Sequence, residues 1–486
     1  MTPLKRLIEN TGAMMIARGL QPFLNFILVV IISRWIGVDG LGEYTTIFSL
    51  LIIFQLICAF GLRMLLTREV AKYPDKTNRY LSNSLILGII ISIFTAFIML
   101  LSIYFLKYDE SITLSASVLS LALIPTALNE IFIGVLAGHE RLKIVGLVTI
   151  IEEIIKVSLC VLLLFMGYRI LTIVIIYVIM RFFSSLLLYY FIHRYIMKLK
   201  FEFDMSFALG LLKQTQIFAY SAVLFALFLQ IDVIILSKMG TIEDVGIYGA
   251  SLRILRFLIM MIQSFFIAFY PILSKLYKEN KQKFEKACYS SGKYFLMITI
   301  PISLVICLIF DKVVIFLFGA DFGPSIPVLQ IIVWVIIPFA ITKIFSFALL
   351  ASNNQRADLL ANFLSAVIKT TVLLIFAYFW GYIGISVGTL LATFAMLIIQ
   401  LVIIRRLLPL TSKHVMNMSL KIFISGVIML IAILILRDIN IILAFIVSVI
   451  IYFMLLVKLN VFSNRDKFFV ESLLKNKKQD FLTSNS

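Results

Sequence analysis

Long apolar runs recur from one end of the chain to the other, and they constrain the fold more than any other feature. Of the 486 residues, 62% are apolar, and the mean hydropathy is +1.09. A soluble domain is typically only about half apolar. Runs of about 18 or more apolar residues with few charges are typical of membrane-spanning helices. The sequence therefore predicts an all-α integral membrane protein that crosses the bilayer many times.

The apolar runs predict fourteen transmembrane helices joined by short loops. The expected helices are 11–36, 44–61, 83–106, 112–138, 144–166, 170–192, 217–238, 247–273, 294–318, 325–350, 358–379, 383–404, 419–436 and 440–457. If the N-terminus is cytoplasmic, thirty of the 43 Lys and Arg residues lie on the inner side and six on the outer side. This bias follows the positive-inside rule and predicts that both termini face the cytoplasm, in a cytoplasmic (inner) membrane. The net charge of +18 then needs no nucleic-acid partner, because membrane lipid and topology explain it.

Two pairs of segments indicate an internal repeat. Residues 31–50 and 236–255 share a small-residue-rich outer loop followed by Gly-x-Tyr, and residues 154–168 resemble 367–382 in a lysine and a Gly-Tyr pair. The offset corresponds to six helices, so both halves keep the same orientation in the membrane. We expect two pseudo-symmetric six-helix lobes, two added helices and a basic cytoplasmic tail. Their expected bounds are 1–198, 199–410, 411–457 and 458–486.

Motifs of nucleotide hydrolysis and metal binding are absent from the sequence. There is no GxxxxGK[ST] phosphate loop, so we expect no ATPase activity. The four cysteines are scattered without CxxC or other metal-ligand spacing, and no metal or other cofactor is expected. The first apolar run lacks a small-residue cleavage site and is expected to remain as a helix. The longest predicted outer loop has only about ten residues, which argues against a membrane glycosyltransferase or polymerase.

Charged residues within the predicted helices are the strongest functional signal, because a charge at mid-bilayer costs at least about 2.5–3.5 kcal/mol. The basic ones are Arg18, Lys156, Arg181, Arg253, Arg256, Lys343 and Lys369. The acidic ones are Glu130, Glu152, Glu153 and Asp232. The two glutamates one turn before Lys156 lie on the same helix face and are expected to neutralise it.

Arg253 and Arg256 are not neutralised within their own helix. They lie about 60° apart on one face, with Gln263 on the same polar stripe, so this face is expected to point into the bundle. Asp232 can pair with only one of them. Two interpretations remain open: an Arg–Asp bridge that ties two helices together, or an anion site in a hydrated cavity. Guanidinium groups are well matched to phosphate.

The second interpretation gives a set of candidate site residues. The expected cationic substrate site consists of Arg18, Arg253, Arg256, Lys369 and Arg181. The expected polar lining is Asn25 and Gln263, and the coupling candidate is Asp232. The sequence thus predicts a cationic cavity for an anionic substrate, without an ATPase.

Two longer motifs resemble a known transporter family. They are "RWIGVDGLGEY" with "FGLRMLLTREVAKY" in residues 34–73, and "QIDVIILSKMGTIEDVGIYGASLRILRFLIMMIQSFFIAFYPILSKLY" at 230–277. Both are similar to the polysaccharide-transport branch of the MOP (MATE-like) flippase superfamily, which contains the O-antigen and capsule repeat-unit flippases. The resemblance spans essentially the whole chain.

The resemblance implies transport of an undecaprenyl-diphosphate-linked oligosaccharide from the inner to the outer leaflet. It implies alternating access in a monomer, coupled to an ion gradient (H⁺ or Na⁺) rather than to ATP. Arg18, Arg253 and Arg256 would hold the diphosphate and acidic sugars, with the lipid tail in the bilayer. The nearest alternative is a lipid II flippase, which also has fourteen helices and a cationic cavity. A multidrug or metabolite antiporter fits less well, because multidrug exporters usually have twelve helices and prefer cations.

Overall fold

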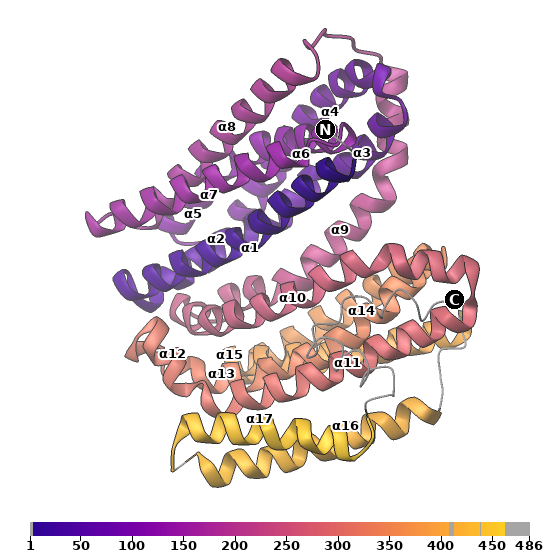
Figure 1. Ribbon diagram of the computed structural model, residues 1–486. Coiled ribbons are helices and arrows are strands. Elements are labelled where there is room, and N and C mark those ends of the chain that lie inside the picture. Colours follow the sequence, from indigo (N-terminus) through magenta and orange to yellow (C-terminus); the bar gives the residue numbers. More distant parts are fainter. Residues whose placement is uncertain (1–2, 408–412, 438, 462–486) are drawn as a thin grey trace. The chain divides into compact units, whose positions relative to one another are not determined.

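The computed structural model describes residues 3–407, 413–437 and 439–461, and their regular secondary structure is entirely helical (Figure 1). The predicted all-α fold class is therefore confirmed for this part of the chain. The predicted tail lies outside the described residues beyond position 461.

Within the described residues, seventeen α-helices follow one another. They are α1 (Pro3–Trp35), α2 (Gly37–Ala59), α3 (Leu62–Lys72), α4 (Thr77–Leu106), α5 (Glu110–Ser120), α6 (Leu123–Gly138), α7 (Leu142–Phe165), α8 (Ile170–Tyr195), α9 (Met205–Met239), α10 (Ile242–Glu279), α11 (Lys281–Ile309), α12 (Asp311–Phe318), α13 (Ser325–Ile332), α14 (Ile336–Ala351), α15 (Gln355–Leu407), α16 (Lys413–Leu436) and α17 (Ile441–Lys458). Short 3₁₀ turns, η1 to η3, connect some of them.

Each of the fourteen predicted segments coincides with helix, but three of them are divided. The predicted helix 112–138 comprises α5 and α6, 294–318 comprises parts of α11 and α12, and 325–350 comprises α13 and α14. The predicted division between 358–379 and 383–404 is confirmed, because α15 consists of two helices that meet in a kink at Gly381. This glycine has non-helical angles (φ 53°, ψ −133°), which it adopts without a Cβ clash.

Nine helical stretches of the described residues are long and apolar enough to cross a membrane, and some of them combine two of these helices. Three shorter apolar stretches accompany them. The helix α7 is not among the nine, and it carries Glu152, Glu153 and Lys156 near its middle. Many apolar side chains on the outside are exposed, for example Tyr104 (75%) and Phe105 (71%) on α4. These features show a multi-pass membrane protein, while the count of fourteen crossings stays a prediction.

Packing divides the chain into two compact units. Unit 1 contains the residues up to Phe257, Val314–Val328 and Leu359–Ala395. Unit 2 contains Leu258–Val313, Leu329–Asp358 and the described residues from Met396 onward. The division expected from the repeat, by lobes and added helices, stays a prediction.

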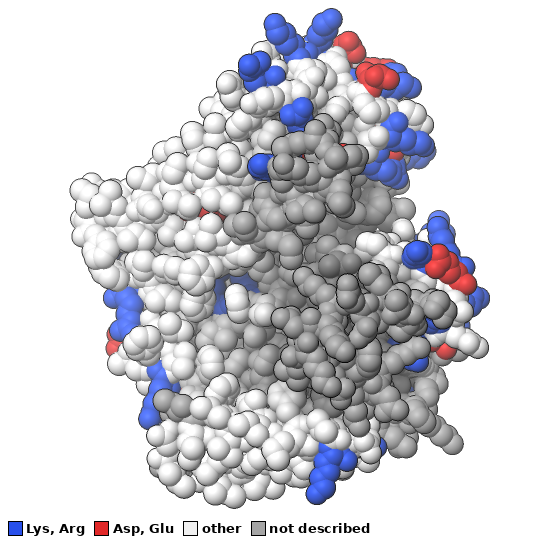
Figure 2. Space-filling view, in the orientation of Figure 1, with Lys and Arg blue, Asp and Glu red and all other residues white. Residues whose placement is uncertain are grey.

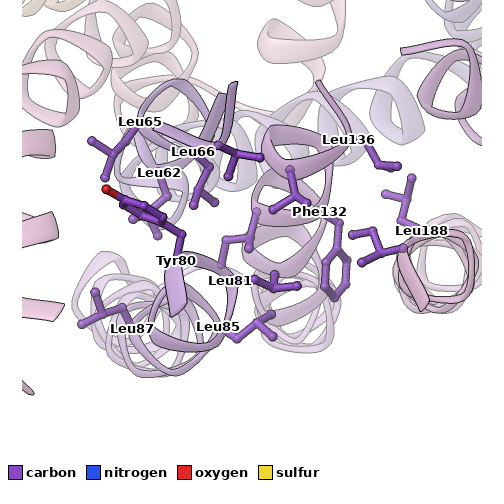
Figure 3. Packing of buried hydrophobic residues seen from close by; sticks show 14 of the residues in the cluster. Leu62, Leu65, Leu66, Tyr80, Leu81, Leu85, Leu87, Phe132, Leu136 and Leu188 are labelled. Atoms are coloured by element: carbon purple, nitrogen blue, oxygen red, sulfur yellow. The ribbon is translucent and has the colours of Figure 1, made fainter. Parts of the chain in front are cut away.

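A leucine-rich core in unit 1 joins α3, α4, α6 and α8 (Figure 3). Leu66 of α3, Leu81 of α4 and Leu136 of α6 are completely buried in it. The helices α3 and α6 approach closely, since a Cβ on Gly134 would lie 2.9 Å from the carbonyl oxygen of Arg63. Such close packing of small residues stabilises helix pairs where lipid supplies little hydrophobic driving force.

The two Gly-x-Tyr motifs of the predicted repeat meet each other in unit 1, where α2 contacts α10. A Cβ on Gly42 would lie 2.0 Å from the carbonyl oxygen of Ile242, and one on Gly246 would lie 2.1 Å from that of Val38. Each glycine thus packs against the residue four positions before the other glycine. The contact is reciprocal, as expected for two elements related by a pseudo-two-fold axis.

The segment between α8 and α9, here named the 196–204 linker, is bound along the start of α4. Asn78 donates to the carbonyl of Lys200 (2.8 Å) and accepts from its N–H (2.9 Å). Asn83 donates to the carbonyl of Glu202 (3.1 Å) and accepts from the N–H of Asp204 (2.9 Å). The side-chain amides of α4 therefore satisfy the extended backbone of the linker as a neighbouring strand would.

Asp204 ends the linker and caps α9. Its carboxylate accepts from the N–H of Phe207 (3.1 Å) and from Arg79 (2.8 Å). These two bonds favour the charged carboxylate and hold the pKa of Asp204 below its usual range. The start of α9 is thus fixed to α4 by charge and by hydrogen bonds. On the face shown in Figure 2, many charged side chains gather at the upper right, and further ones lie at the left edge.

In unit 2, α16 and α17 pack on α11. Met297, Met429 and Tyr452 belong to their shared apolar core, and the Tyr452 hydroxyl donates to the carbonyl of Met297 (3.2 Å). Gly426 of α16 allows the approach, because a Cβ there would lie 2.9 Å from Ile300. The last two helices are therefore an integral part of unit 2.

Candidate functional site

Three groups of polar side chains within the apolar helices of unit 1 contain most of the candidate residues that the sequence singles out. The first is named the α7 group. In it the Glu153 carboxylate lies 2.7 Å from Lys156 Nζ and accepts the amide groups of Gln21 (2.9 Å) and Asn25 (3.2 Å) from α1. Glu153 is only 1% exposed. The predicted neutralisation of Lys156 within its own helix is confirmed for this glutamate.

The other glutamate of α7 has a different partner. Glu152 lies 3.3 Å from Arg181 of α8. Arg181 also donates to the hydroxyl of Tyr177 (3.1 Å), and the Tyr177 ring lies beneath both Arg181 and Lys156, at 5.1 and 5.5 Å. The α7 group therefore contains as many carboxylates as cations. Arg181, a predicted substrate residue, lies in a neutralised network.

The second group, named the Asp232 group, joins α9, α10 and α15. The Asp232 carboxylate accepts from the hydroxyl of Tyr248 (2.7 Å) and lies 4.0 Å from Lys369 Nζ. Lys369 also donates to the carbonyl of Phe228. Asp232 and Lys369 are each 2% exposed. A buried ion pair of this kind keeps both charges only because each has further polar partners.

The Arg–Asp bridge, one of the two interpretations that the sequence leaves open, is not among the ion pairs of the described residues. Asp232 pairs with Lys369, which lies 137 positions further along the chain, and it also attracts Arg256 electrostatically. The competing cation comes from α15, and only the packing of a third helix brings it to Asp232.

The third group is the arginine pair, Arg253 and Arg256 of α10. Arg256 donates to the side-chain oxygen of Gln230 (2.6 Å), and the Arg253 guanidinium lies 5.3 Å from the centre of the Tyr44 ring. Both arginines are partly exposed, whereas Gln230 is 3% and Tyr44 is 4% exposed. Neither guanidinium forms a direct ion pair with a carboxylate of a described residue, although Asp232 attracts Arg256 electrostatically. Two positive charges within apolar helices thus lack a direct carboxylate partner.

The other predicted site residues are not brought together with the arginine pair. The backbone of Arg18 lies in α1, but its side chain is outside the described residues. Asn25 binds Glu153 in the α7 group. Gln263 belongs to unit 2, where its side-chain nitrogen is buried without a hydrogen-bond partner. Among the predicted substrate residues, Lys369 and Arg181 therefore each form an ion pair with a carboxylate, whereas Arg253 and Arg256 form none with a described residue.

Three partners of these groups do not follow from the sequence: Gln230, Tyr44 and Tyr248. The two tyrosines belong to the Gly-x-Tyr motifs, so the repeat marks their positions but not their contacts. Gln230 lies two residues before Asp232, and residues at this spacing do not share a helix face. Its proximity to Arg256 depends on the packing of α9 against α10.

Comparison with known proteins adds the family to this geometry. Residues 7–277 match the family described as "Polysaccharide biosynthesis protein", which is more than half of the chain. The chain belongs to this family. No curated protein sequence matches it significantly.

Several solved transporter structures share the fold of this polysaccharide biosynthesis family member. A structure described as lipid II flippase MurJ, inward closed conformation, matches with a TM-score of 0.74 at 17% identity, over 96% of this chain and 100% of that one. An inward-facing multidrug resistance MATE family transporter of the MOP superfamily matches with 0.70 at 18% identity, over 80% and 96%. A MOP superfamily transporter from Pyrococcus furiosus, described as having a binding pocket of reverse polarity, matches with 0.60 at 17% identity, over 83% and 95%.

These similarities confirm the predicted MOP superfamily fold. The matched structures are those of transporters and a flippase, not of enzymes.

Proposed function

We propose that this protein flips an undecaprenyl-diphosphate-linked oligosaccharide repeat unit, of the O-antigen or capsule type, from the cytoplasmic to the outer leaflet. The observation that carries the proposal is the arginine pair, whose two guanidinium groups contact Gln230 and Tyr44 and form no direct ion pair with a carboxylate of the described residues. A diphosphate diester carries one negative charge on each phosphate, so two guanidinium groups match it in charge and in geometry. Membership of a polysaccharide biosynthesis family supports a glycan-bearing substrate.

In this proposal the arginine pair binds the diphosphate, while the lipid tail stays in the bilayer. Arg18 remains a further proposed substrate residue. Asp232 and Glu152 already offset the charges of Lys369 and Arg181, so these two residues attract an anionic substrate less strongly than the arginine pair does. Transport proceeds by alternating access without ATP hydrolysis, in a monomer of the inner membrane with both termini in the cytoplasm.

Asp232 remains the proposed coupling residue, now through Lys369. When Asp232 is charged it offsets the Lys369 ammonium and attracts Arg256, and protonation would remove this compensation and make the site more positive. Its ionisation state would therefore set the affinity for an anion. The coupling ion, H⁺ or Na⁺, is open in this scheme. Replacing Asp232 by Asn should abolish the pH dependence of transport; an Asp232→Asn protein with wild-type pH dependence would refute the coupling role.

A lipid II flippase is the second candidate function. The similarity to the MurJ structure over 96% of this chain favours it, and lipid II also carries a diphosphate. Complementation of bacterial strains that lack either a repeat-unit flippase or a lipid II flippase separates the two. A multidrug antiporter for cationic drugs is disfavoured by two uncompensated arginines.

The direct test is transport by an Arg253→Ala/Arg256→Ala variant in cells that depend on the protein. We expect transport to fall at least about tenfold while the amount of protein in the membrane stays normal, because each lost guanidinium removes a charge-assisted contact worth about 1.5–3 kcal/mol. Arg437→Ala is the control, since that arginine pairs with Asp311 (3.2 Å) in unit 2. Normal transport by the double variant would refute the proposal, and loss of the protein itself would favour a purely structural role for the pair.

A further inference from the structure

The partners of the arginine pair differ in kind from those of the other intramembrane cations of unit 1. Lys156, Arg181 and Lys369 each lie next to a carboxylate, at 2.7, 3.3 and 4.0 Å. Arg256 is held by the neutral amide of Gln230, and Arg253 by the face of the Tyr44 ring. The Gln230 and Tyr44 side chains are almost completely buried, whereas the two arginines are partly exposed.

A neutral partner orients a guanidinium without cancelling its charge. Arginine has five N–H donors in a rigid plane, and a bidentate carboxylate occupies two of them and supplies a compensating charge. The Gln230 oxygen accepts from one nitrogen of Arg256 and leaves its charge intact. An aromatic face attracts the cation electrostatically and occupies no N–H donor.

We propose that Gln230 and Tyr44 are positioning residues of the anion site. They fix the direction of Arg256 and Arg253 and leave the positive charge and most N–H donors for the diphosphate. This inference rests on the proposed function, since it concerns how the proposed anion site is preorganised before the anion binds. An uncharged partner that fixes an arginine side chain before the ligand arrives reduces the conformational entropy that this side chain loses on binding.

The packing around Gln230 and Tyr44 supports their role as positioning residues. The Tyr44 ring lies 4.3 Å from Phe48, and Phe48 makes an edge contact with Tyr177 at 5.3 Å, so α2 and α8 together fix the ring that faces Arg253. Gln230 lies on α9, 3% exposed, with its oxygen 2.6 Å from the Arg256 guanidinium. The guanidiniums are thus attached to rigid elements through uncharged side chains.

A structural role and a positioning role predict opposite effects of Gln230→Glu. The substitution is nearly isosteric and turns the hydrogen bond to Arg256 into an ion pair, which ties α9 to α10 at least as well. If Gln230 only joins helices, transport should not suffer. If it keeps Arg256 available, the new carboxylate neutralises that cation and weakens the anion site.

The experiment measures binding of undecaprenyl diphosphate to the full-length protein in lipid nanodiscs, together with its unfolding temperature. For Gln230→Glu we expect at least about tenfold weaker binding, equivalent to about 1.4 kcal/mol, with an unchanged or raised unfolding temperature. The matched control is Gln214→Glu on the same helix, where Gln214 accepts from the exposed Arg68 at 3.2 Å; its binding should equal that of the wild type. For Tyr44 we expect Tyr44→Leu to bind severalfold more weakly than Tyr44→Phe, which keeps the ring.

The outcomes separate the inference from the proposed function. Wild-type binding by Gln230→Glu, with loss of binding by Arg256→Ala, would overturn the positioning role and leave the proposed function standing. Wild-type binding by Arg256→Ala would overturn the proposed function and the inference with it. If Gln230→Glu does not fold, Gln230→Met removes the acceptor without adding charge, and unchanged binding by that variant overturns the inference as well.

Discussion

The repeat places a lysine at matching positions in its two halves, and the fold treats the two lysines differently. Lys156 pairs with Glu153 one turn away on the same helix, whereas Lys369 pairs with Asp232 of another helix. The α7 group has as many carboxylates as cations, whereas in the second half Asp232 is surrounded by Lys369 and by Arg256, which forms no direct ion pair. The fold is symmetric in its reciprocal glycine contact and asymmetric in its charge. We infer that substrate binding depends on the region of the second half in which the charges differ from those of the first half.

Removal of each lysine should give the largest difference between the halves. Lys369→Met leaves a buried Asp232 carboxylate without its cation, and we expect a loss of about 3–5 kcal/mol in stability. Lys156→Met leaves Glu153 with two amide donors, so we expect a smaller loss, about 1–3 kcal/mol. Thermal unfolding in detergent measures both.

A double variant provides the control for the lysine comparison. Adding Asp232→Asn to Lys369→Met should restore much of the stability, because no buried charge remains. Equal losses for the two single lysine variants would contradict the asymmetry.

The reciprocal contact of Gly42 and Gly246 tests the symmetry between the two halves. Gly42→Ala and Gly246→Ala each place a Cβ about as close to a backbone carbonyl, at 2.0 and 2.1 Å, so either must force α2 and α10 apart. Overpacking of this kind costs about 1–3 kcal/mol, and we expect similar losses in the two variants. Gly210→Ala is the control, since nothing lies within 4 Å of its Cβ position. Clearly unequal effects of the two repeat glycines would show that the contact is not reciprocal in energy.

The linker is expected to contribute less. Asn83→Ala removes two hydrogen bonds to linker backbone groups, and we expect a loss of about 1–2 kcal/mol. Limited proteolysis within the 196–204 linker should become faster by the factor that corresponds to this loss of free energy, whereas the rate of cleavage elsewhere should not change. A linker that stays protected in Asn83→Ala would mean that the hydrogen bonds do not hold it.

The smallest expected effect concerns pH. Because the folded-state pKa of Asp204 lies below its unfolded value, its contribution to stability is present above the unfolded pKa and is lost as pH falls through the folded pKa. Asp204→Asn should therefore reduce the stability slightly near neutral pH and make no difference once the carboxyl of the wild type is protonated. Unfolding temperatures measured between neutral and strongly acidic pH test this sign, and a larger effect of the substitution in acid would contradict it.

The sequence alone predicted the class, the helices and the local pairs. Apolar runs of membrane length, the repeat motifs and the turn that joins Glu153 to Lys156 all depend on residues close together in the chain. Periodicity also placed Arg253 and Arg256 on one face. These signals are local, and helix geometry converts them directly into structure.

Only the tertiary structure decided which cations are free. Lys369 reaches Asp232 and Tyr44 reaches Arg253 from helices that are far apart in sequence, and Gln230 reaches Arg256 from the preceding helix. Helix packing has several allowed arrangements for the same apolar pattern, so no spacing rule selects these pairs. The charge of a residue can be read from the sequence, but whether that charge is compensated depends on neighbours that the fold alone supplies.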